Sequence, residues 1–163
     1  MSKFADLHIH TFYSDSTSSP EEIVNEAINA ELACISITDH DTIEGIEPTV
    51  KLAKAKGLEV LTGIELSTEI GGKDVHLLAY CFDLKDPELF AVIAKAQDGR
   101  VERIKKMIAK LKDLGVNNID FEEVRVLAHS RSLGRPHLAT VLKEKGWVAD
   151  MAQAFYKYLG EPL

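Results

Sequence analysis

The stretch ACISITDHD, residues 33–41, decides the fold class of this chain. It starts as an almost continuous apolar run, without the alternation of a half-exposed strand, and it ends in charged side chains. This pattern is typical of a parallel β-strand that is covered on both faces. The stretch therefore predicts an α/β architecture in which ionisable side chains gather where the strand ends.

Further strands and helices are predicted on either side of this strand. FADLHIH (4–10) predicts a strand before it, and LEVLTGIELS (58–67) predicts one after it. Ser19, Pro20 and Glu22 form the capped start of a helix between the first two strands. A second helix is predicted to begin at Pro48. Gly71 and Gly72 then separate two extended runs and predict a hairpin.

The character of the sequence changes after residue 86. Apolar residues recur at helical spacing over residues 87–115, and no strand is predicted beyond that point. We expect two units, an α/β unit over residues 1–86 and a helical subdomain over residues 87–163. Shorter helices are predicted within DFEEVRVLA (120–128), GRPHLATVLKEKG (134–146) and ADMAQAFYKYLG (149–160).

Composition limits the classes of partner. The chain has 163 residues, with 19 Lys and Arg against 26 Asp and Glu, and a formal charge of -7. This balance argues against extended duplex nucleic acid or a membrane surface bound through basic charge, although it allows a small phosphorylated substrate held by metal. The N-terminus has no signal-peptide pattern and no apolar run reaches membrane-spanning length, so we expect a cytoplasmic protein.

Metal-binding side chains are predicted at the ends of three strands. Residues two apart in a strand share a face, so Asp6, His8 and His10 form one row. His40 and Glu65 stand at the ends of the next two strands. The carboxyl ends of parallel strands meet at one rim, where we expect His8, His10, His40 and Glu65 to converge. A His-x-His pair alone is also typical of core histidines that each make one hydrogen bond.

Two further side chains extend this set. Asp15 lies in the loop after the first strand, and His76 lies on the strand after the hairpin. Taken singly, Asp15 is as well explained as a turn residue and His76 as a core histidine. Together with the others they make a mixed set that suits zinc, manganese or iron, with Glu65 able to bridge two ions. Asp6, and either Asp39 or Asp41, are candidates to orient the imidazoles.

Four segments resemble successive motifs of the polymerase and histidinol phosphatase (PHP) superfamily of metal-dependent phosphoesterases. The resemblance implies the N-terminal part of a distorted (β/α)7, TIM-like barrel with two or three divalent ions on its rim. It also implies that His8 and His10 bind one ion, Asp15 and His40 a second, that Glu65 bridges, and that His76 serves a third. The segments are DLHIHTFYSDSTSSPEEIV (6–24), ISITDHDTIEG (35–45), GIELST (63–68) and VHLLAY (75–80).

GRPHLA (134–139) adds a narrower resemblance. It is similar to the helical insertion of PHP members that hydrolyse 3',5'-nucleoside bisphosphates and of related 5'-to-3' exonucleases. That resemblance implies a helical cap over the site, with Arg135 as a catalytic contact to a substrate phosphate and His137 as a second contact. The alternatives are a solvated helix residue for Arg135 and simple packing for His137. Arg100, Arg103, Lys105 and Lys106 are expected on a solvated helix face.

The chain also departs from the PHP pattern. The family barrel continues into later strands with another metal-binding histidine and a final Asp-x-His pair, whereas this chain has no histidine after His137. We therefore expect an N-terminal part of a longer family enzyme, with its metal centre open on one side. An incomplete barrel exposes strand edges that a second copy can cover, so a homo-oligomer is possible.

Three functions follow as hypotheses. The first is a phosphoesterase that hydrolyses a nucleotide or short oligonucleotide through metal-activated water. The second is a phosphatase of a small metabolite such as histidinol phosphate. The third is a metal-binding or structural module without catalysis. No Gly-x-Ser-x-Gly elbow supports a serine nucleophile.

Overall fold

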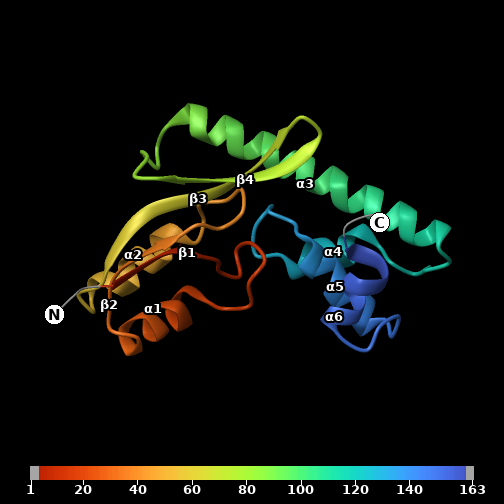
Figure 1. The fold of residues 1–163 in the computed structure, drawn as a ribbon, viewed down its shortest axis with the longest axis horizontal. Helices are drawn as coiled ribbons and strands as arrows, with labels where there is room; N and C mark the ends of the chain where they lie inside the picture. Colours follow the sequence, from red (N-terminus) through yellow and green to blue (C-terminus); the bar gives the residue numbers. More distant parts are fainter. Residues whose placement is uncertain (1–3, 161–163) are drawn as a thin grey trace.

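The computed structural model describes residues 4–160 and is built on one four-stranded sheet (Figure 1). Its strands are β1 (Phe4–Ile9), β2 (Leu32–Ile37), β3 (Glu59–Ile70) and β4 (Lys73–Tyr80), in the order β1-β2-β3-β4. The first three are parallel, and β4 returns antiparallel to β3. The Tyr80 hydroxyl on β4 donates to the Leu7 carbonyl on β1 at 2.7 Å, so the sheet is curled enough to bring its two edge strands together.

Two helices cover one face of this sheet. Helix α1 (Pro20–Asn29) starts with the predicted capping box, in which Ser19 and Glu22 bond each other's backbone amides. Helix α2 (Ile46–Lys54) starts two residues before Pro48, which corrects the predicted start. Pro48 is tolerated there because amides in the first turn have no partner within the helix. The core beneath these helices contains Ile23, Val24, Ala27, Ile35, Ile37, Ile46, Ala53 and Leu58.

The predicted hairpin joins β3 and β4. Ile70 pairs with Lys73 around Gly71 and Gly72, which both have positive φ. Continued pairing with β4 extends β3 to Ile70, beyond its predicted end. The register sets His76 opposite Ser67, two residues from Glu65, so His76 and Glu65 share a face of the sheet.

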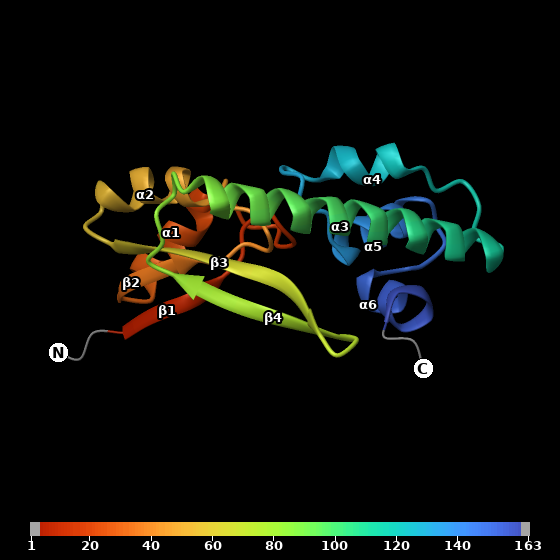
Figure 2. The ribbon, with the colours of Figure 1, turned by 90° about the horizontal axis from the view of Figure 1, so that it is seen from above.

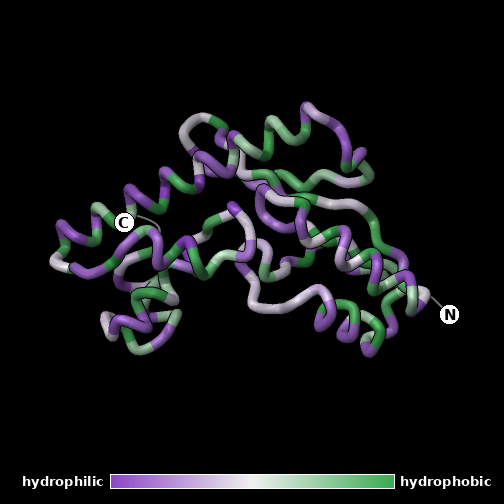
Figure 3. The backbone as a smooth tube through the Cα atoms, turned by 180° about the vertical axis from the view of Figure 1, so that it is seen from behind, coloured by the Kyte–Doolittle hydropathy of each residue, from purple (hydrophilic) through white to green (hydrophobic). Residues whose placement is uncertain are grey.

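Helix α3 (Pro87–Asp113) is continuous and connects the sheet with the remaining helices (Figure 2). It alternates between hydrophilic and hydrophobic segments along its length (Figure 3). The helices after it are α4 (Phe121–Leu127), α5 (Arg135–Glu144) and α6 (Met151–Ala154). The last predicted helix is divided, because a π-helical turn, η1 (Phe155–Leu159), follows α6 and closes with the Gly160 amide on the Phe155 carbonyl.

A second hydrophobic core lies among α3, α4, α5 and the C-terminal turns. Ile104, Ile108 and Leu111 of α3 pack there, which confirms part of the predicted apolar stripe. The same helix also contacts β3 and the loop after β2. The division at residues 86 and 87 stays a prediction, and residues 1–3 and 161–163 of the two predicted units lie outside the described part. Among the described helices, none is both long and apolar enough to cross a membrane.

Candidate metal centre

Glu65 is the centre of the cluster of ionisable side chains at the sheet rim. It lies on β3, and its side chain is 6% exposed. One carboxylate oxygen, Oε2, lies 2.8 Å from His8 Nε2 and 3.1 Å from His10 Nε2. The other, Oε1, lies 2.6 Å from His76 Nδ1 and 3.8 Å from His40 Nδ1. Side chains from all four strands or their ends therefore meet at one carboxylate.

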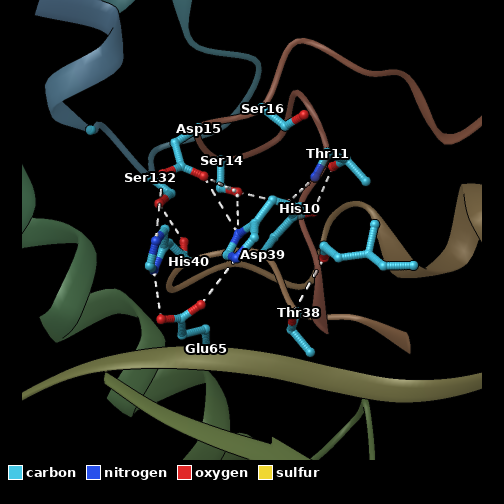
Figure 4. Close-up of polar contacts among 12 residues, drawn as sticks. His10, Thr11, Ser14, Asp15, Ser16, Thr38, Asp39, His40, Glu65 and Ser132 are labelled. Atoms are coloured by element: carbon cyan, nitrogen blue, oxygen red, sulfur yellow. Dashed lines mark hydrogen bonds and ion pairs between the residues drawn. The ribbon is translucent and has the colours of Figure 1, made fainter. Parts of the chain in front are cut away.

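Asp15 approaches the same cluster from the opposite side (Figure 4). Its carboxylate oxygens lie 3.5 Å from His10 Nδ1 and 3.5 Å from His40 Nε2. His10 and His40 thus each stand between Asp15 and Glu65. The structure brings together all six side chains predicted from the sequence as metal ligands, namely His8, His10, Asp15, His40, Glu65 and His76.

The cluster divides into three overlapping groups of possible ligands. In each group one nitrogen or oxygen atom per residue lies within 4.8 Å of the others. Glu65, His10 and His40 each belong to two groups, which is the arrangement needed for neighbouring ions that share ligands. The groups are His8, His10 and Glu65, then His10, Asp15 and His40, then His40, Glu65 and His76.

The environment of His40 indicates whether the cluster suits a metal. The Nδ1 atom of His40 is buried and has no hydrogen-bond partner among residues 4–160, which is costly for a polar atom. The distance of 3.8 Å to Glu65 is too long for a hydrogen bond. Two donor atoms that each lie about 2 Å from one ion are at most about 4 Å apart, so this pair suits a shared ion. The donor set therefore fits a divalent metal.

The electrostatics of the cluster keep His40 and Glu65 in their metal-binding forms. Burial, reinforced by the charge of Arg100, lowers the pKa of His40 to about 4, so this imidazole is neutral near pH 7. Burial alone raises the pKa of Glu65, but hydrogen bonds from His8 and His76 and the nearby imidazoles outweigh it, and the pKa is lowered. Neutral imidazoles and ionised carboxylates are the forms that bind metals.

The three aspartates predicted as orienting partners lie near the cluster but form hydrogen bonds with other groups. Asp39 is fully buried and accepts hydrogen bonds from the Thr11 amide at 2.6 Å, the Thr11 hydroxyl at 2.6 Å and the Ser14 hydroxyl at 2.7 Å. Asp6 accepts from the His8 amide at 3.1 Å, and Asp41 bonds Arg100. Within the described residues none of the three is bonded to an imidazole. Asp39 instead fixes the loop that carries Asp15.

The helical half closes one side of the cluster. A cavity of about 330 Å³ lies between the rim and α3, α5 and η1. Its size is in the usual range for small-ligand sites. The residues that line it include Asp15, His40 and His76 from the cluster and Arg100, Arg103, Arg135 and Phe155 from the helical half.

Arg135 and His137 lie close to this cavity in different ways. Arg135 lines the cavity. Its Nη1 donates a hydrogen bond to the Leu159 carbonyl at 3.2 Å, and its guanidinium lies over the Phe155 ring. His137 Nδ1 accepts from the Gly134 amide at 3.0 Å, across the start of α5. Burial lowers the pKa of His137, so this side chain is neutral near pH 7.

Arg100 is the functional candidate that the sequence analysis missed. It was expected on a solvated face, but its side chain is 14% exposed and is paired with buried Asp41. A signal was present, because Gln97 and Arg100 occupy the positions between Ile93 and Ile104 where the apolar stripe of α3 is interrupted. Arg103 also lines the cavity, with Nη2 3.1 Å from Asp74.

The pKa of His40 predicts that acid destabilises the metal-free protein. The imidazole has an ordinary pKa of 6.5 and a folded pKa of about 4, so folding disfavours its protonation. The free energy of unfolding is therefore highest above pH 6.5 and decreases as the pH falls toward 4. The decrease is on the order of 2 kcal/mol between pH 7 and pH 5. Urea unfolding in a chelator at both pH values measures this difference. We expect His40→Gln to reduce this difference in unfolding free energy, whereas His129→Gln should leave it unchanged. Equal differences in the two variants would contradict the prediction.

Comparison with known proteins gives a consistent family match. Residues 6–99 match the sequence model of the PHP domain. A 5'-3' exoribonuclease of Haemophilus influenzae is 34% identical over 161 residues, which are 99% of this chain and 58% of that protein. A 3',5'-nucleoside bisphosphate phosphatase of Chromobacterium violaceum is 32% identical over 159 residues, which are 96% of this chain and 56% of that protein.

The fold is shared with solved structures. A protein from Bifidobacterium adolescentis, assigned to the metal-dependent phosphoesterases, superposes with a TM-score of 0.88 at 27% identity. The match covers 100% of this chain and 57% of that protein. It confirms the predicted fold class, an α/β barrel part with helices. The chain spans just over half the length of the curated relatives it matches.

Proposed function

The chain belongs to the PHP domain family, and from this premise we propose that it forms the metal-binding part of a phosphoesterase acting on nucleotides or short oligonucleotides. The observation that carries the proposal is the cluster of four histidines and Asp15 around Glu65, in which His40 Nδ1 has no hydrogen-bond partner in the described part of the chain. Chance clusters of surface charge do not leave a buried imidazole nitrogen without a hydrogen bond.

We assign the ligands in three overlapping groups. His8, His10 and Glu65 hold one divalent ion, His10, Asp15 and His40 hold a second, and His40, Glu65 and His76 can hold a third. Manganese, zinc and iron all suit such donors. Divalent ions bound there supply an activated water and neutralise the charge of a phosphoryl group. Asp39 has a supporting role, because it fixes the Thr11–Ser14 loop beside Asp15.

Substrate phosphate is proposed to enter the cavity between the cluster and the helical half. Arg135 lines this cavity, and within the described residues only its Nη1 is hydrogen-bonded, so its remaining N–H donors are free for phosphate oxygens. Arg103 adds a second cation, whose pair with Asp74 is about half exposed. His137 can help through Nε2, since Nδ1 is bonded to Gly134.

The names of two relatives supply the substrate class. One relative is a 3',5'-nucleoside bisphosphate phosphatase and another a 5'-3' exoribonuclease. Both names describe hydrolysis of a phosphate ester in a nucleotide or a nucleotide chain. A substrate with two phosphates matches a site that offers metal on one side and arginines on the other.

Hydrolysis by the purified chain tests the proposal. The protein is stripped with a chelator, reloaded with manganese and supplied with 3',5'-adenosine bisphosphate or a short RNA labelled at its 5' end. We expect manganese-dependent release of phosphate or mononucleotide that falls at least about 100-fold in His8→Ala/His40→Ala, because each of the three ligand groups loses one histidine.

His129→Gln is the matched control, because His129 lies outside the cluster and stacks on Phe12. It should keep the activity of the parent chain. Unchanged turnover in the double variant would overturn the proposal. Bound manganese without turnover of either substrate would instead identify a metal-binding module without catalysis.

A further inference from the structure

We propose that Arg100 is a positioning residue, which locks the His40–Asp41 turn to the helical half and so sets the orientation of a metal ligand. The inference rests on the proposed metal centre and deepens it. It assigns Arg100 a role apart from Arg103 and Arg135, although all three line the same cavity.

Each nitrogen of the Arg100 guanidinium donates one hydrogen bond to the protein. Nε donates to Asp41 Oδ2, Nη2 donates to the Ser67 hydroxyl at 2.7 Å, and Nη1 donates to the Leu133 carbonyl at 3.3 Å. Each nitrogen of the planar fork therefore has a partner, and the carboxylate on its inner side is completely buried. These three bonds anchor the guanidinium in the protein and leave one N–H on each of Nη1 and Nη2.

The turn that Arg100 holds is in an uncommon conformation. Asp41 has a φ of +50°, in the left-handed region that residues with a β-carbon adopt at a cost. Its amide donates to the Glu65 carbonyl at 2.9 Å, and its Oδ1 accepts from the Ser67 amide at 2.8 Å. Such a conformation persists only where surrounding contacts fix it.

The helical half contributes the remaining contacts of this turn. Gln97 on α3 donates from Nε2 to the Asp41 carbonyl at 2.9 Å. The Ser132 hydroxyl, in the loop before α5, donates to the His40 carbonyl (Figure 4). The backbone carbonyls of His40 and Asp41 are thus held by the loop before α5 and by α3, and docking of the helical half fixes where the His40 ring points.

Charge and position predict opposite effects for Arg100. A cation close to a metal site repels the metal, so removal of its charge alone would strengthen metal binding. Loss of a partner that orients a ligand weakens metal binding, typically by 10–100-fold. The sign of the change in metal affinity therefore separates the two roles.

The experiment measures the affinity of the purified chain for manganese by titration calorimetry in Arg100→Gln and in Arg103→Gln. We expect about tenfold weaker binding in Arg100→Gln. Arg103→Gln, which removes the same charge one helical turn away, should not weaken it. Arg100→Lys keeps the charge but loses the planar guanidinium and its several N–H donors, so we expect weakened manganese binding in this variant as well. Equal or tighter binding in Arg100→Gln would overturn the proposal.

Kinetics give a second readout and separate this inference from the proposed function. At saturating manganese, Arg100→Gln should regain most of its kcat with an unchanged KM for the bisphosphate, whereas a raised KM that manganese does not correct would show a substrate contact. If the parent chain has no turnover, the proposed function fails while the manganese titration still decides the role of Arg100. If Arg100→Gln does not fold, Ser132→Ala tests the same lock, and unaltered manganese affinity there contradicts it.

Discussion

Glu65→Gln is expected to abolish metal binding, with manganese affinity at least about 100-fold below that of the parent chain. Glu65 supplies an oxygen to two of the three ligand groups, and three histidine nitrogens lie within 3.1 Å of its carboxylate. An amide has nearly the same size as the carboxylate, but it has no negative charge and offers only one acceptor oxygen. Manganese titration of the variant, with circular dichroism to verify folding, measures the loss.

Glu69→Gln is the matched control for this prediction. Glu69 lies four residues further along β3, is exposed and belongs to none of the three ligand groups. It should bind manganese as the parent does. Retention of tight binding in Glu65→Gln would show that Glu65 does not hold the ions, and the assignment of the centre would be wrong.

Gly63→Ala is expected to destabilise the fold by about 3 kcal/mol. A β-carbon at this position would lie 2.9 Å from the Ile37 carbonyl oxygen and 2.9 Å from Thr38 Cγ2, and it would also collide with the Ser36 hydroxyl. The backbone of β2 cannot move aside without opening the parallel pairing of β2 and β3 that positions His40 and Glu65. Urea unfolding of the metal-free protein measures the loss.

Gly99→Ala gives the opposite expectation and serves as the control. Gly99 lies inside α3, and a β-carbon there would contact no atom of the described residues within 4 Å. Alanine should stabilise the protein by about 1 kcal/mol, because glycine loses more conformational freedom in a helix. Equal stabilities for Gly63→Ala and Gly99→Ala would contradict this description of the β2–β3 contact.

The site was predictable where local spacing and strand direction determine it. His8, His10 and His40 stand at the ends of β1 and β2, and Glu65 lies on β3 opposite His40, where the parallel pairing ends. Such strand ends share one rim of a sheet. Asp15 and His76 had equally good local explanations as a turn residue and a core histidine. The family resemblance predicted both as ligands, and the hairpin register and the first loop place them beside Glu65 and His40.

Other contacts could not be deduced from the chain. The buried aspartates show this, because Asp39 bonds Thr11 and Ser14 and Asp41 bonds Arg100, although the sequence suggested that they orient histidines. Arg100 lies 59 residues from Asp41 in the chain. A side chain of this length can reach solvent or a buried carboxylate, and only the docking of α3 against the rim selects between them.

The sequence by itself determined the strands, the helices, their order and the donors at the strand ends, because these depend on hydrophobic periodicity and capping over a few residues. Only the tertiary structure decided which atoms surround Glu65, what holds the His40–Asp41 turn and how the helical half closes the cavity. The physical reason is that these contacts join residues tens of positions apart, and their partners are selected by the packing of whole elements rather than by local spacing.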